Sequence, residues 1–75
     1  MSVKPLNTLN AGKTAVIKEF VNNARLQSRL VEMGAIPGIK VRIVKKAPFH
    51  GPIELKIRSY HLILRWQDAG SILVS

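Results

Sequence analysis

The sequence contains no cysteine and only four acidic residues among its 75 positions. The lack of cysteine excludes a disulfide scaffold, a thiolate metal site and a cysteine nucleophile. No apolar run approaches the roughly 18 to 20 residues that a membrane-spanning helix needs. Residues 1–10 lack the apolar core of a secretion signal, so we expect an unsecreted protein without a membrane span of its own.

Basic residues are the most prominent feature that is present. Twelve Lys and Arg against four Asp and Glu give a formal net charge of +8, and 47% of the residues are hydrophobic. That hydrophobic content is too high for a disordered chain, so residues 1–75 are expected to form a single folded domain. A strongly basic small domain favours an anionic partner, whether an acidic protein, a nucleic acid or an anionic membrane surface.

Hydrophobic periodicity predicts a mainly β fold. Alternating or β-branched patterns indicate five short strands, and one stretch repeats apolar residues at helical spacing. The helix is expected to use Leu26, Leu30 and Met33 as its buried face and to end at Gly34. Five short strands and one short α-helix in so small a chain favour a five-stranded SH3-like antiparallel barrel, with the OB-fold as the alternative. The expected strands are 14–21, 39–43, 53–58, 61–66 and 71–74.

The residues that could carry catalysis or hold a metal are few. Four carboxylates form no matched pair, and the two histidines, His50 and His61, show no ligand-like spacing. His61 is expected to face solvent on the fourth strand with no carboxylate beside it. We therefore predict a protein that is not an enzyme, with no metal site and no required cofactor.

The charge on the predicted hairpin of strands 39–43 and 53–58 says more about function than the few candidate catalytic or metal-binding residues do. Strand alternation places four cations on its outward face, and Lys45 and Lys46 are expected to extend this patch toward the loop 47–52. Such a face suits docking on an acidic partner, but it also suits a solvated surface that keeps the protein soluble. Nucleic-acid binding is the alternative function, weakened by the small number of aromatic residues left for base stacking. The four outward cations are Lys40, Arg42, Lys56 and Arg58.

The segment 29–38, Arg-Leu-Val-Glu-Met-Gly-Ala-Ile-Pro-Gly, resembles the R-L-x-E-M-G-hydrophobic-x-P-G signature of the FeoA family. The resemblance continues through Ala47-Pro48 and Gly51-Pro52 and covers essentially the whole chain. FeoA-like domains are small cytosolic SH3-like barrels of bacteria. They act as accessories to FeoB, a ferrous-iron transporter of the inner membrane with a cytosolic GTP-binding domain.

The resemblance implies a cytoplasmic accessory protein of ferrous iron uptake that docks on the cytosolic part of a FeoB-like transporter. It would be peripheral to the membrane through that partner, with no nucleic acid involved, and weak binding of Fe²⁺ or another divalent metal stays open. The family loop commonly reads Ala-Pro-x-Gly-Asp-Pro, whereas here Phe49 and His50 precede Gly51-Pro52 and no acidic residue is present. We expect Phe49, His50 and the basic hairpin to contact the partner. Arg29, which lies off the apolar stripe of the helix, is expected to contact either the partner or Glu32.

Overall fold

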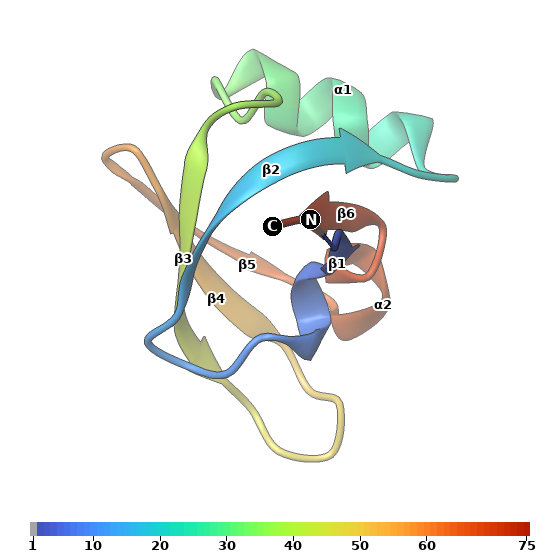
Figure 1. The fold of residues 1–75 in the computed structure, drawn as a ribbon. Helices are drawn as coiled ribbons and strands as arrows, with labels where there is room; N and C mark the ends of the chain where they lie inside the picture. Colours follow the sequence, from blue (N-terminus) through green and yellow to red (C-terminus); the bar gives the residue numbers. More distant parts are fainter. Residues whose placement is uncertain (1) are drawn as a thin grey trace.

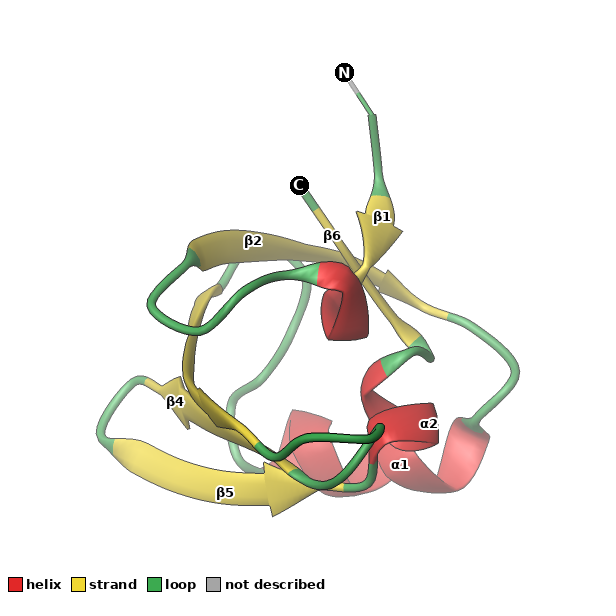
Figure 2. Cartoon of the chain, turned by 90° about the horizontal axis from the view of Figure 1, so that it is seen from below, coloured by secondary structure: helices red, strands yellow, loops and turns green. Residues whose placement is uncertain are grey.

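A computed structural model describes residues 2–75 and shows six strands in one antiparallel sheet. The sheet curves around a common core (Figure 1), and its end strands β1 and β5 lie on opposite sides of the molecule (Figure 2). The expected mainly β antiparallel arrangement is confirmed, although β1 and β5 do not pair with each other to close the sheet. In sheet order the strands are β1 (Lys4–Pro5), β6 (Ile72–Val74), β2 (Thr14–Phe20), β3 (Lys40–Lys46), β4 (Ile53–Ile57) and β5 (Tyr60–Leu64).

Strand β2 gives the sheet its curvature because its two halves pair with different strands. Its first half, from Thr14 to Val16, pairs with β3, and its second half, from Ile17 to Phe20, pairs with β6. The register shifts between Ile17 and Glu19, and such irregularities bend and twist a strand. The short strand β1 was not expected, because the sequence before residue 13 lacks an alternating pattern.

The core is filled from alternate positions of the strands. Ile53, Leu55 and Ile57 of β4 are buried, as their alternation with charged residues predicts. Ile17 of β2 and Ile43 of β3 are buried in the same cluster. Because the inward positions are apolar, the polar neighbours in these strands are left on the outer face of the sheet.

Helix α1 (Ala24–Glu32) lies across one end of the curved sheet (Figure 1). The side chain of Asn23 accepts a hydrogen bond of 3.1 Å from the Leu26 backbone N–H, which caps the first turn. Leu26 and Leu30 are buried, and Met33 packs partly against the core, so the expected apolar face is confirmed. Gly34 ends the helix with φ +86°, a left-handed conformation that glycine adopts without strain.

Two further short helices are present, where the sequence predicts an irregular lead-in at residues 6–12 and a turn at residues 67–70. The 3₁₀ helix η1 (Leu6–Thr8) follows β1, and α2 (Trp66–Ala69) follows β5. Trp66 was expected to continue the alternation of the fourth strand, but it begins α2 and packs partly against the core. No helix within residues 2–75 is long and apolar enough to span a bilayer.

Candidate docking surface

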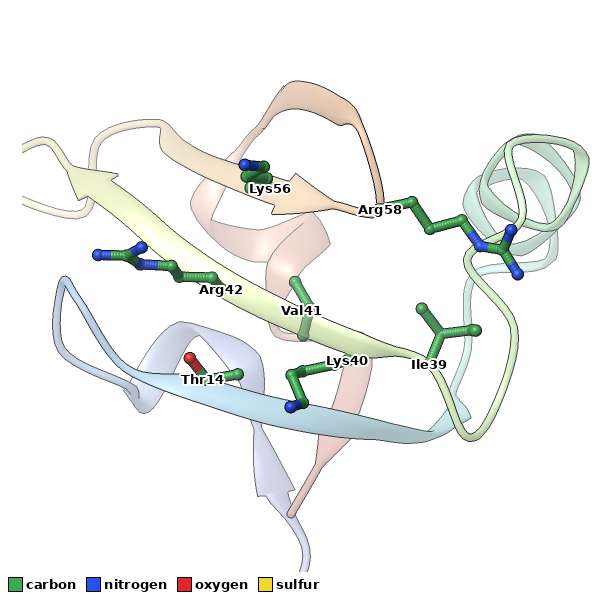
Figure 3. Close-up of a pocket in the computed structure, with 7 residues that line it drawn as sticks. All are labelled: Thr14, Ile39, Lys40, Val41, Arg42, Lys56 and Arg58. Atoms are coloured by element: carbon green, nitrogen blue, oxygen red, sulfur yellow. The ribbon is translucent and has the colours of Figure 1, made fainter.

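The outward face of β3 and β4 brings four predicted cations to one groove. Arg42 pairs directly with Lys56, and Val41 pairs with Ile57, so the outward side chains of the two strands lie side by side. The resulting shallow groove encloses about 540 Å³ (Figure 3). We call it the basic groove; it is lined by Thr14, Ile39, Lys40, Val41, Arg42, Lys56 and Arg58.

The head groups of these four cations are spread along the groove, and that of Arg58 points to the opposite end from that of Arg42 (Figure 3). Lys40 lies toward β2 and Arg58 reaches toward α1. This arrangement reduces the repulsion that like charges opposed across a ladder otherwise cause. Within residues 2–75, the only ion-pair contact joins His61 and Glu54, so the cations of the basic groove have no acidic partner there.

Arg58 differs from the other three because the fold itself uses its side chain. Arg58 stands at the first position of the two-residue turn between Ile57 and Tyr60, with φ +57°. Its Nε lies 3.3 Å from where a Cβ would stand on Gly34, so the guanidinium packs over the C-terminal end of α1. A cation at that end is favoured by the helix dipole.

The expected extension of the patch by both Lys45 and Lys46 is wrong for Lys46. The register of β3 against β4 shifts between Ile43 and Lys45, and this shift turns Lys46 toward the N-terminal segment. Lys46 Nζ donates hydrogen bonds of 2.9 Å to the carbonyl oxygens of Asn7 and Leu9. Lys45 remains exposed on the surface.

The loop 47–52, which joins β3 to β4, projects from the end of the sheet opposite α1 (Figure 1). Phe49 at its tip is 99% exposed. The His50 ring stacks on the Trp66 indole with ring centroids 3.9 Å apart and planes 12° from parallel. Trp66 was expected to end the fourth strand, so this support for His50 was not foreseen.

His61 does have a carboxylate beside it, contrary to expectation. Lys56 pairs with His61 and Glu54 pairs with Ile63, which places Glu54 diagonally across from His61 on the same face. His61 Nδ1 and Glu54 Oε2 are 3.2 Å apart. No group of three or more potential metal ligands occurs among residues 2–75.

Arg29 lies away from the basic groove. It lines a separate groove of about 430 Å³ together with Arg25, Arg65, Asn23, Leu26 and Asp68. Arg29 and Glu32 form no ion pair in the described part of the chain. The spacing of Arg25 and Arg29 on one helix face is readable from the sequence, whereas the approach of Arg65 depends on the tertiary fold.

Comparison with known protein families decides the relationship. The FeoA domain matches residues 4–75. The chain belongs to the FeoA family. This confirms the resemblance seen in the sequence and associates the chain with ferrous iron transport.

One FeoA relative contains both transport components in a single chain. It is the Fe(2+) transport protein A/Fe(2+) transporter FeoB fusion protein of Porphyromonas gingivalis, 33% identical over 69 residues. The match covers 92% of this chain and 8% of that protein, so the chain spans only a small part of this relative's length.

Solved FeoA structures share the fold. Iron(II) transport protein A from Clostridium thermocellum is 37% identical with a TM-score of 0.83, covering 95% of this chain and 44% of that one. Stenotrophomonas maltophilia FeoA complexed with zinc is 27% identical with a TM-score of 0.81, covering 93% of this chain and 87% of that one. The latter is described as a prokaryotic SH3 domain protein, which confirms the expected SH3-like fold.

Proposed function

We propose that this chain is an accessory protein of ferrous iron uptake that docks on the cytosolic part of a FeoB-like transporter. Its role is binding, without a reaction or a required cofactor of its own, and it works at the cytoplasmic side of the membrane through its partner. The observation that carries the proposal is the relative in which transport protein A and FeoB share one chain. Two proteins joined covalently in one organism commonly act together when they are separate in another.

The basic groove supports this function as the docking surface. Lys40, Arg42 and Lys56 have exposed side chains and no acidic partner within residues 2–75. Cations held on a rigid sheet attract an acidic surface and orient it during encounter. We therefore place the first contact with the transporter on the outward face of β3 and β4.

A binding measurement with charge-reversed variants tests the proposal. The triple variant Lys40→Glu, Arg42→Glu and Lys56→Glu leaves Arg58 on α1 and should weaken binding to the purified cytosolic part of a FeoB transporter by about tenfold or more. Calorimetry or biolayer interferometry at two salt concentrations measures the effect. Higher salt should weaken the wild-type complex because the attraction is electrostatic.

The matched control makes the same change in charge at exposed lysines outside the basic groove: Lys4→Glu, Lys13→Glu and Lys18→Glu. This variant should retain most of the affinity. Equal losses in both triple variants would show that only the net charge matters and would remove the basic groove from the interface. A wild-type chain that does not bind the transporter fragment would refute the docking function.

A further inference from the structure

The loop 47–52 holds Phe49 in a backbone conformation that phenylalanine seldom adopts. Phe49 and His50 have φ values of +59° and +58°, and the Gly51 N–H donates a 3.1 Å hydrogen bond to the Pro48 carbonyl. These features define a type I′ turn with Phe49 and His50 at its two central positions. Asn and Gly are the usual occupants of these positions, because a bulky side chain at positive φ is strained. The fold therefore keeps phenylalanine where a small residue would be more stable.

Several contacts hold this turn in one conformation. The Ala47 N–H donates a 3.0 Å hydrogen bond to the Pro52 carbonyl, closing the base of the loop. A Cβ on Gly51 would lie 2.6 Å from the Ala47 Cβ, so the two segments approach as closely as glycine allows. The stack of His50 on Trp66 fastens the tip to α2. Strain maintained by surrounding structure is typical of functional positions.

The result is an aromatic side chain that packs against nothing in its own molecule. Phe49 is 99% exposed, more than any other large hydrophobic residue of the described chain. Next to the loop, a mostly apolar groove of about 360 Å³ includes Ala47, Pro52 and Ile63, and Ile63 is 68% exposed. An exposed aromatic on a fixed turn, beside an apolar surface, has the properties of an interface hot spot.

We propose that Phe49 is the apolar anchor of the docking interface and inserts into an apolar pocket rimmed by acidic side chains on the protein partner. This inference rests on the docking function proposed above and adds the residue that would dominate its affinity. Charge complementarity selects the occupant. The loop extends from the hairpin that carries the basic groove, with Lys45 exposed at its base, and the one acidic residue near it, Glu54, contacts His61. A second copy of a chain with net charge +8 would be repelled, which favours an acidic partner instead.

Substitution of Phe49 separates anchoring from folding because the two effects have opposite signs. Phe49→Asn should raise the thermal midpoint by about 3 °C or more, since asparagine tolerates positive φ and the lost side chain makes no packing contact. The same variant, and Phe49→Ala, should weaken binding to the purified cytosolic FeoB fragment about thirtyfold, as expected for a hot spot. The matched control is Val31→Ala, which shortens an exposed apolar side chain on α1 and should change affinity less than twofold.

Trp66 is the only tryptophan, so its fluorescence reports directly on the loop. Binding of the FeoB fragment should change the emission of Trp66 in the wild-type chain, because the occupied tip lies next to the His50–Trp66 stack. If the wild-type chain binds but Phe49→Ala binds within twofold of it, the anchor is refuted and the docking function survives. If the wild-type chain does not bind, the docking function itself fails. If the wild-type chain co-sediments with vesicles containing anionic phosphatidylglycerol but Phe49→Ala does not, the tip inserts into lipid. That result would refute the insertion of Phe49 into a pocket on a protein partner.

Discussion

The basic side chains of the β3–β4 hairpin form two groups that differ in what they contact. Lys40, Arg42 and Lys56 project from the sheet without an acidic partner in the described chain, and we call them the free cations. At one end Arg58 packs over Gly34, and at the other Lys46 donates hydrogen bonds to two backbone carbonyls. Arg58 and Lys46 therefore stabilise the fold, whereas the free cations remain available to a partner.

This difference shows why net charge alone does not identify a binding surface. All five side chains carry a positive charge, but they do not share one role. Of the four predicted outward cations, only three are free to contact a partner, because Arg58 packs on the end of α1. Substituting a structural cation would lower stability and reduce binding indirectly. A test of docking must therefore change the free cations and leave Arg58 and Lys46 intact.

Among the basic side chains of the hairpin, Lys46 is expected to contribute most to stability. Lys46→Met keeps the length of the side chain but removes both hydrogen bonds to the Asn7 and Leu9 carbonyls. We expect a loss of about 2 kcal/mol in the free energy of unfolding, because hydrogen bonds to charged groups contribute about 1.5–3 kcal/mol. Urea denaturation measures the loss. The neighbouring exposed residue provides the control, since Lys45→Met should stay within about 0.5 kcal/mol of wild type. Equal effects at the two lysines would show that the hydrogen bonds of Lys46 do not stabilise the fold.

A smaller effect, about 0.5 kcal/mol, is expected from the packing of Arg58 on Gly34. Gly34→Ala and Gly38→Ala both place alanine at positive φ, +86° and +95°, at a strain cost of about 1–2 kcal/mol each. A Cβ on Gly38 meets nothing within 4 Å, whereas a Cβ on Gly34 meets Arg58. Gly34→Ala should therefore cost about 0.5 kcal/mol more than Gly38→Ala, a coupling of the size seen between residues in contact. In an Arg58→Ala background the two alanine variants should become equal; a persistent difference would show that Arg58 is not its cause.

The placement of the free cations was predictable because strand alternation determines which side chains share a face. Lys40, Arg42 and Lys56 follow from a period of two, and Leu26 and Leu30 follow in the same way from helical spacing. Family resemblance then supplied the fold and the association with iron transport, which composition alone left open between several anionic partners.

The features that escaped prediction depend on local irregularity or on contacts distant in sequence. A register shift after Ile43 turns the side chain of Lys46 to the other face of the sheet, and no residue type in the sequence predicts such a shift. The type I′ turn was missed because Phe49 and His50 occupy positions where sequence rules expect asparagine or glycine. The diagonal contact of His61 with Glu54 and the stack of His50 on Trp66 require the pairing of β4 with β5 and the start of α2.

The smallest effect, and the one of opposite sign, is expected for the free cations. Neutralising the free cations with Lys40→Gln, Arg42→Gln and Lys56→Gln removes like charges opposed across the ladder, such as Arg42 and Lys56. Stability at low salt should rise by about 0.3 kcal/mol, within the range of cross-strand charge effects. The gain should shrink in about 1 M salt, where the screening length falls to about 3 Å. Thermal denaturation at both salt concentrations measures it. A loss of stability instead would mean that these cations, like Lys46 and Arg58, serve the fold, and the basic groove would then have no surplus charge to offer a partner.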